Sequence, residues 1–178
     1  MQVFTEKDAE VLVLTRKEGL LSRLGHDLKI AAGRFRIEID GASRRIEASC
    51  EAASLRVVCA LRDGRDDPGE LSQGDQADID QKLQRDVLDV AHHPTIQLKG
   101  TAEPAGDGYK LTGTLTLHGK SREVTVPVRR SGELLVAELE VHQPDYGIKP
   151  FSAALGALKV AADVRIQVRI PAAAAGPP

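Results

Sequence analysis

The strongest pattern in this 178-residue chain is an alternation of apolar and polar residues with a period of two. Such alternation is typical of β-strands that bury one face and expose the other. It is clearest over residues 160–170, where Val, Ala and Ile alternate with Asp, Arg and Gln. The other alternating runs lie at residues 11–15, 34–40, 45–50, 55–61, 96–99, 109–117, 124–129 and 135–141.

Short turn sequences separate several of these runs: Asp40-Gly41, Gly106-Asp107-Gly108, His118-Gly119-Lys120 and Ser131-Gly132. Connections this short favour antiparallel neighbours. Because each run has one apolar and one polar face, the pattern predicts a barrel or a sandwich of about nine strands.

One segment breaks the alternation. Between Ala77 and His92, four apolar residues recur at helical spacing: Ile79, Leu83, Val87 and Val90. Asp75 or Asp78 would cap this helix, and Pro94 follows its end. We therefore expect one amphipathic helix over about 77–92, covering the mouth or the end of the barrel. A second, short helix is expected over residues 150–156.

Composition places the chain among globular proteins, with 42% hydrophobic and 28% charged residues. Its length suits a single domain, expected over residues 1–171 and followed by a low-complexity tail at 172–178. A net charge of −2 with interleaved signs, and only 3% aromatic residues, argue against a nucleic-acid partner. No run approaches the length of a membrane-spanning helix, so we expect no stable membrane insertion.

The N-terminal residues show no positively charged stretch followed by an apolar run, which predicts a cytoplasmic location. Cys50 and Cys59 do not form a C-x-x-C pair, and free thiols are the expected state in such a chain. Pairing of two copies through a strand edge or the helix remains open.

Candidate catalytic chemistry is sparse. The five histidines show no ligand spacing typical of a metal site, and neither a nucleophile elbow nor a phosphate-binding loop occurs. An enzyme hypothesis would use His26, His118 and an acid such as Asp145 in a metal-assisted hydrolase or isomerase. The sequence predicts instead a protein that is not an enzyme, with no catalytic residue, no metal and no cofactor.

The side chains expected to face the barrel interior indicate ligand binding instead of catalysis. A barrel of about eight strands either fills its interior with side chains or encloses a small ligand. Several positions expected to face inward carry small side chains, which would leave room for an apolar guest: Ala48, Cys50, Ala137 and Ala162. The alternative is a filled barrel that acts as a stress-related interaction protein.

Four segments, taken in order, resemble the YceI-like family. They are Ser22–Leu28 leading into Gly33-Arg34-Phe35, Asp86–Ile96, Leu111–Val124 ending in Val126-Pro127-Val128, and Asp145–Ile148 followed by Leu158–Val160 and the last strand. The third, with its L-x-G-x-L-T-L-H-G run, is the most specific. Together they extend over about residues 10–171.

The resemblance implies an all-β fold: an extended, lipocalin-like antiparallel barrel of eight to nine strands with the helix packed over one side. It also implies non-catalytic binding of a polyisoprenoid, an isoprenoid quinone or a fatty-acid-like molecule in the barrel. Of the positions that match the family, His26 and Tyr146 would bind a polar head. The expected ligand-binding residues are His26, Phe35, Ile37, Leu88, Leu98, Leu115, Leu117, Tyr146 and Val164, with Val87 as an alternative to Leu88.

Overall fold

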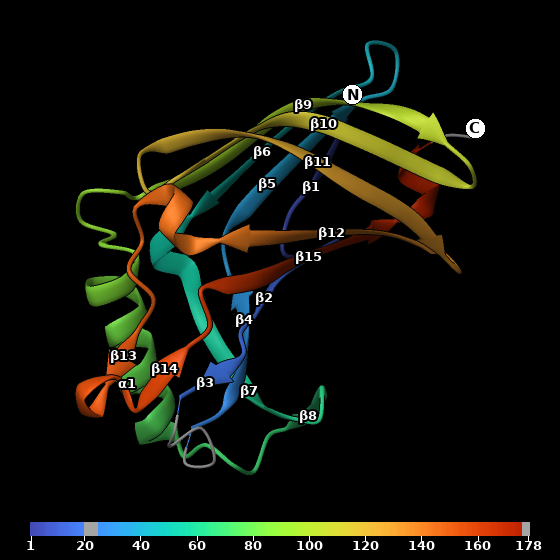
Figure 1. Ribbon diagram of the computed structural model, residues 1–178. Helices are drawn as coiled ribbons and strands as arrows, with labels where there is room; N and C mark the ends of the chain where they lie inside the picture. The colour runs from blue at the N-terminus through green and yellow to red at the C-terminus, as the bar shows by residue number, and fades with distance from the viewer. Residues whose placement is uncertain (20–24, 176–178) are drawn as a thin grey trace.

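The computed structural model describes residues 1–19 and 25–175, and within them antiparallel β-strands dominate (Figure 1). Twelve strands form one hydrogen-bonded sheet in the order β1-β5-β6-β9-β10-β11-β12-β15-β2-β4-β7-β8. Their bounds are β1 Gln2–Phe4, β2 Glu10–Leu14, β4 Asp27–Ala32, β5 Phe35–Asp40, β6 Arg45–Glu51, β7 Leu55–Arg62, β8 Arg65–Asp67, β9 Thr95–Ala105, β10 Gly108–Leu117, β11 Lys120–Ser131, β12 Leu134–His142 and β15 Asp163–Pro171. The predicted all-β fold with one helix is confirmed.

The sheet closes on itself because three of its chain segments are long, bent runs. From β2, the pairing passes through β15, β12, β11, β10, β9 and β6 to β5. Strand β5 continues the chain from β4, and β4 pairs with β2. We count β1–β2, β4–β5 and β6–β7 as one bent run each. The closed barrel then consists of eight antiparallel runs: these three and β9, β10, β11, β12 and β15. The turns expected from sequence at residues 41, 106, 118 and 132 all lie between paired strands.

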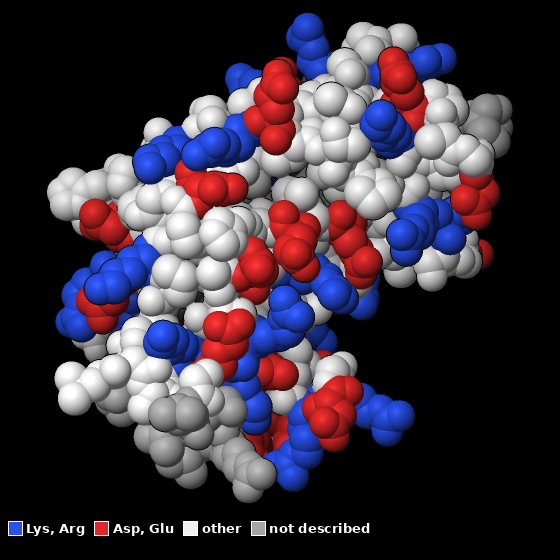
Figure 2. Space-filling model, viewed as in Figure 1, with Lys and Arg blue, Asp and Glu red and all other residues white. Residues whose placement is uncertain are grey.

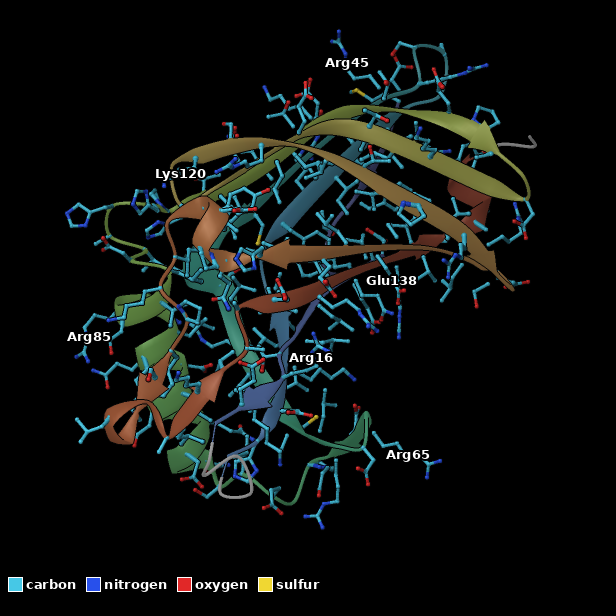
Figure 3. All side chains as sticks on the ribbon, in the orientation of Figure 1. Arg16, Arg45, Arg65, Arg85, Lys120 and Glu138 are labelled. Carbon is cyan, nitrogen blue, oxygen red and sulfur yellow. The ribbon has the colours of Figure 1, made fainter. Side chains whose placement is uncertain are left out.

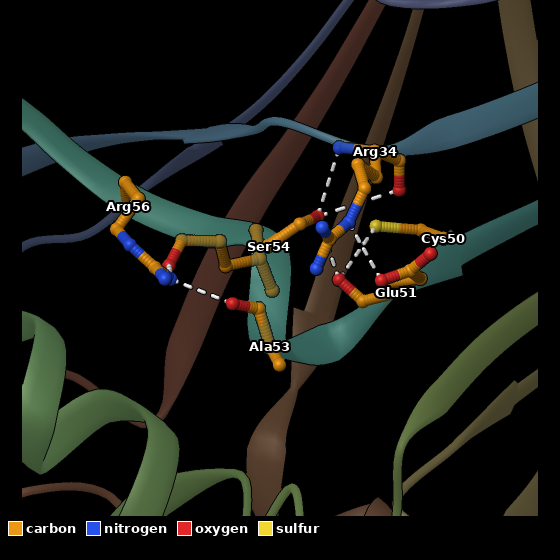
Figure 4. A network of polar contacts seen from close by, with 7 residues as sticks. Arg34, Cys50, Glu51, Ala53, Ser54 and Arg56 are labelled. Atoms are coloured by element: carbon orange, nitrogen blue, oxygen red, sulfur yellow. Dashed lines mark hydrogen bonds and ion pairs between the residues drawn. The ribbon is translucent and has the colours of Figure 1, made fainter.

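Ser54 holds two neighbouring bends in place, one between β4 and β5 and one between β6 and β7 (Figure 4). The Gly33 N–H donates to the Ser54 carbonyl and the Arg34 N–H to the Ser54 hydroxyl, both at 3.0 Å. The Ser54 hydroxyl also donates to the Glu51 carbonyl at 2.7 Å. These bonds satisfy backbone groups where β4 passes into β5 and β6 into β7, so both runs change direction without losing their pairing.

A smaller sheet and the helix close one end of the barrel. The sheet has the order β13-β14-β3, with bounds β13 Ser152–Ala153, β14 Leu158–Val160 and β3 Lys17–Glu18. Helix α1 (Gln73–Lys82) lies beside it and continues as a π-helical turn, η3 (Leu83–Val87) (Figure 1). Ile79 of α1 and Leu83 of η3 are partly buried and pack against the core of the barrel.

The helix starts earlier and ends earlier than the sequence pattern predicted. Its N-cap is Ser72, whose hydroxyl accepts from the Asp75 N–H at 3.1 Å while the Asp75 carboxylate accepts from the Ser72 N–H at 2.9 Å. Asp75 therefore completes a capping box and is not itself the cap. The end falls at Val87 because Asp89 has a φ of +45°, which a right-handed helix cannot contain.

The prediction of a short helix over residues 150–156 is wrong. Residues 152–160 form the β13–β14 hairpin, and only Ala154–Gly156 make a 3₁₀ turn at its tip. Leu155 and Gly156 have φ values of +55° and +87°, so the chain turns back on itself there. The run predicted at 160–170 also divides, since Val160 belongs to β14 and β15 begins at Asp163.

Three further features complete the fold. In the described part of the chain no helix is long and apolar enough to span a membrane. Cys50 and Cys59 are free thiols, as predicted. Residues 172–175 of the predicted tail form a 3₁₀ turn, where the Ala172 N–H donates to the Glu133 carbonyl at 2.7 Å; residues 176–178 lie outside the described residues.

Asp80 fastens α1 to the barrel. Its carboxylate accepts a 2.7 Å hydrogen bond from the Val57 N–H of β7 and lies 3.7 Å from Arg56 Nε. Asp80→Ala would leave the Val57 N–H without its partner, so we expect it to lower the free energy of unfolding by about 1–3 kcal/mol. Urea unfolding and hydrogen exchange at the Val57 amide measure this loss.

Asp80→Asn is the matched control because it keeps an acceptor oxygen at the same position. Its unfolding midpoint should lie between those of the parent protein and Asp80→Ala. If Asp80→Ala were as stable as the parent and the Val57 amide stayed equally protected, the hydrogen bond would not be what holds the helix.

Candidate ligand cavity

Two apolar chambers lie inside the barrel. The first, of about 510 Å³, is next to α1 and the small sheet. The second, of about 440 Å³, extends toward the turn between β5 and β6. Each lies in the 300–1,000 Å³ range of small-molecule sites. Every second side chain of the alternating strands is apolar and faces the interior, and these side chains form the walls of both chambers.

The two chambers meet at a junction. Their shared wall consists of one residue each from β2, β7, β9, β10 and β15: Val13, Leu55, Ile96, Leu115 and Ile166. All five side chains are apolar, and the Ile166 and Val13 backbones are directly paired. The wall that the two chambers have in common is therefore entirely apolar. A filled barrel, the alternative considered from sequence, does not describe this interior.

Most of the residues expected to bind a ligand line the chambers. The first chamber is lined by His26, Leu88, Leu115, Leu117 and Val164, and the second by Phe35, Ile37, Leu98 and again Leu115. Val87, the alternative to Leu88, also lines the first chamber. Of the four small side chains expected to face inward, Ala48, Cys50 and Ala137 line the second chamber.

Tyr146 is the exception. It is buried in the apolar core, 4% exposed, in the 3₁₀ turn η4 (Gln143–Tyr146), but it lines neither chamber. Burial raises the pKa of its hydroxyl. A role for Tyr146 in holding a polar head therefore has no support from the geometry, and its packing explains its place in the sequence.

Two of the polar side chains that line the first chamber, those of Thr15 and Gln143, are buried. Thr15 is buried, and its hydroxyl accepts from the Leu28 N–H at 3.2 Å. Gln143 is buried, and its side-chain amide donates to the Ala161 carbonyl at 3.0 Å. Both side chains are hydrogen-bonded within the protein, and Gln143 leaves its side-chain carbonyl oxygen available to a donor on a ligand.

His26 lies on the outer part of this chamber. Its Nδ1 is 3.7 Å from the Glu70 carboxylate, and about a third of its side chain is exposed. The preceding residues of the first family-like segment, Ser22–Leu24, lie outside the described residues. His26 is thus close enough to solvent to contact a polar head while the apolar chamber lies behind it.

The sequence did not identify the charged rim of the first chamber. Lys17, Lys82 and Lys159 line it together with Asp75 and Asp78. Lys159 lies in the fourth family-like segment, and Asp75 and Asp78 were considered only as helix caps. Nothing in the sequence pattern places these residues together, because only the topology brings β3, α1 and β14 side by side. Elsewhere the charges are mixed: Lys and Arg alternate with Asp and Glu over the face in Figure 2, and Arg45, Arg65 and Arg85 point outward in Figure 3.

Cys50 provides a chemical reporter inside the second chamber. Burial raises the pKa of its thiol to about 11. The thiolate is the reactive form, and at pH 8 on the order of one thiol in a thousand would be ionised, so alkylation should be slow. In a Cys59→Ala variant we expect alkylation of Cys50 by iodoacetamide to accelerate about tenfold per pH unit from pH 8 to 10.

Mass spectrometry of quenched samples gives the alkylation rate, and an unfolded sample supplies the reference rate. Occupation of the chamber by a long-chain molecule should slow the reaction further at every pH. Alkylation as fast in the folded protein as in the unfolded reference would contradict the burial of this thiol.

The residues of the enzyme hypothesis occupy different surroundings. His118, at a φ of +51°, stacks against His93 with ring centroids 4.0 Å apart. Burial and the neighbouring His93 lower the pKa of His118. The Asp145 carbonyl accepts from Arg122, whereas His26 faces Glu70. Within residues 1–19 and 25–175, no group of three His, Cys, Asp or Glu side chains is arranged to hold a metal ion.

An eight-run antiparallel barrel with an apolar interior and one covering helix defines a lipocalin-like barrel protein. A family model described as the YceI-like domain matches residues 14–172, so the chain belongs to the YceI-like family. The resemblance seen in the sequence is therefore confirmed.

A solved structure shows the same fold. The crystal structure of Burkholderia cenocepacia BcnA is similar over 91% of this chain and 94% of that chain, with 20% sequence identity and a TM-score of 0.61. The Campylobacter jejuni YCEI protein aligns with 76% of this chain and 78% of its own, at 17% identity and a TM-score of 0.45. No curated protein sequence matches this chain significantly.

Proposed function

We propose that this protein binds one long apolar or amphiphilic molecule inside the connected chambers and carries it without transforming it. The candidates are a polyisoprenoid, an isoprenoid quinone or a fatty-acid-like molecule. The observation that carries the proposal is the pair of apolar chambers that meet at the five shared side chains of the junction. Membership of the YceI-like family, whose fold is associated with lipid binding, agrees with it.

The driving force would be removal of the apolar chain from water. Each buried methylene contributes about 0.8 kcal/mol, and the chambers offer an apolar wall along the interior of the barrel. A compact ligand would occupy one chamber and leave the other unused. A long chain would use both, so affinity should increase with chain length until the two chambers are filled.

The polar end of the ligand would lie in the first chamber. The polar side chains at its outer part, such as His26 and Lys17, are accessible to solvent, whereas the junction is lined by apolar side chains alone. A head group at the junction would lose its hydration without gaining hydrogen bonds, which costs several kcal/mol for a charged group. The chain would therefore enter tail first, and its tail would reach the second chamber.

The proposal is tested on protein purified in its native state. An organic extract examined by mass spectrometry should contain an apolar molecule in near-equal molar ratio to the protein. Delipidated protein should then take up an added polyprenol or long-chain fatty acid with one-to-one stoichiometry. A clean extract together with no uptake of either compound would contradict the proposed function.

A further inference from the structure

Three lysines line the outer part of the first chamber, where the polar head of the ligand would lie. Lys17 comes from β3, Lys82 from the last turn of α1 and Lys159 from β14. Among the described residues, none of the three has a carboxylate within 4 Å, although Lys29 and Lys99 elsewhere both pair with acids. Their ammonium groups are thus not neutralised by ion pairs within the described structure.

Two of these lysines are held by contacts that leave their charge available. The Lys17 ammonium donates one hydrogen bond, of 3.1 Å, to the Gly25 carbonyl, and an ammonium group has two further N–H bonds to offer. The Lys82 ammonium lies 5.9 Å from the centre of the Phe151 ring, within the range of a cation–π contact. Gly25 and Phe151 both line the chamber, so these contacts hold the two charges beside its apolar wall.

Acids also lie near the rim, although among the described residues none forms an ion pair with these ammonium groups. Asp27 accepts a 2.8 Å hydrogen bond from the Lys17 backbone N–H. The hydrogen bond from Arg85, and with it the charges of Arg85 and Lys82, lower the pKa of Asp86.

Asp75 accepts hydrogen bonds from the Ser72 N–H and hydroxyl, at 2.9 and 2.6 Å, and so belongs to the cap of α1. Glu18 lies directly opposite Lys159 in the β14–β3 pair, so of the three lysines Lys159 has an acid across from it in the small sheet. Asp78 remains on the rim as the one further acid that lines the chamber.

We infer that the head of the bound molecule is an anion, a carboxylate or a phosphate, held by Lys17 and Lys82 at the outer part of the first chamber, with Lys159 adding to the positive field. This inference rests on the proposed function, because it assigns the head of the same amphiphile. Ammonium groups beside an apolar wall attract an anion more strongly than they would in open water. A hydrogen bond to a charged partner is also about twice as strong as one between neutral groups.

The test compares two ligands that differ only in the head. Delipidated protein is titrated with oleic acid and with oleyl alcohol at pH 8 and low salt, below their aggregation concentrations. Oleic acid should bind about tenfold or more tightly, and added salt should narrow the difference. Oleyl phosphate, run beside them, distinguishes a phosphate preference from a carboxylate preference within the same anionic class.

Variants then assign the preference to the rim. In the Lys17→Gln/Lys82→Gln double variant, oleic acid affinity should fall about tenfold while oleyl alcohol affinity stays within twofold. Unchanged alcohol binding also shows that the variant is folded and its chambers intact. Lys110→Gln, on the exposed face of β10, is the matched control and should bind both ligands as the parent does.

Equal binding of acid and alcohol by the parent protein would overturn the anionic head and leave the proposed function standing. A preference for the acid that persists unchanged in the double variant would overturn the assignment to Lys17 and Lys82. If the parent bound neither ligand nor oleyl phosphate, the proposed function itself would fail and the head-group inference with it.

Discussion

Val13→Trp is expected to abolish most of the affinity for long-chain ligands while leaving short-chain ligands bound. Val13 lines both chambers together with Leu115 and Ile166, so an indole there would fill the space that a ligand reaching from one chamber to the other must cross. A tail stopped at this point would leave its last methylenes in water. If four methylenes are excluded, at about 0.8 kcal/mol each, the loss is about 3 kcal/mol, on the order of 100-fold in dissociation constant.

Titration with a ten-carbon and an eighteen-carbon fatty acid measures the effect. The eighteen-carbon ligand should lose on the order of 100-fold, and the ten-carbon ligand, which fits the first chamber alone, should lose less than threefold. Val58→Trp is the matched control because Val58 is 46% exposed on β7 and lines neither chamber. Unchanged eighteen-carbon affinity in a folded Val13→Trp variant would show that the chambers are not used as one.

Gly113→Ala is expected to damage the fold severely although it adds only one methyl group. Gly113 of β10 is paired with Gly100 of β9, and the two backbones approach closely. A Cβ on Gly113 would overlap the Lys99 carbonyl oxygen and lie 2.7 Å from the Gly100 Cα. Because both contacts are with backbone, no side chain can move aside, and the β9–β10 pair would have to separate locally.

Such a clash should cost about 3 kcal/mol of folding free energy. For a chain of this size, the melting temperature should fall by about 10 °C. Gly69→Ala is the control, since a Cβ on Gly69 would meet nothing within 4 Å and its backbone has no positive φ, and its melting temperature should change by less than about 2 °C. A Gly113→Ala variant as stable as Gly69→Ala would show that the strands are not constrained at this point.

The sequence predicted the walls of the cavity well because period-two alternation reports directly which side chains share a face. Phe35, Ile37 and Leu98 reach the second chamber as the pattern indicated, and Leu117 and Val164 reach the first. In each case the local pattern and the tertiary packing require the same side of the strand to be apolar.

The differences between the predicted and observed elements have local physical causes. Ser72 was not recognised as the helix cap because six residues, 73–78, separate it from Ile79, where the apolar spacing begins. Asp89, which ends the segment in a left-handed conformation, is not a glycine and so gives no signal in the sequence. Leu155 likewise adopts a positive φ that its side chain disfavours, which turned an expected helix into a hairpin. The closed circuit depends on bends at Gly33-Arg34 and Ala52–Ser54 that interrupt the alternation for only two or three residues.

The rim could not be found from the sequence. Lys17, Lys82 and Lys159 are separated by 65 and 77 positions, on two strands and a helix that meet only in the folded protein. Tyr146 differs from the other positions that match the family: His26, Phe35 and Leu117 line the chambers, whereas Tyr146 is buried in the core and lines neither. Its contact with a ligand stays a prediction.

The most direct test of a single apolar path through the barrel is an NMR measurement of contacts between a bound eighteen-carbon fatty acid and the methyl groups of the protein. With one ligand bound, we predict nuclear Overhauser effects from the middle of its chain to Leu115 and Ile166, and from its terminal methyl group to Ile37 or Val168 in the second chamber. Contacts confined to methyl groups on the outer surface, or a terminal methyl group that reaches no residue beyond the junction, would contradict it.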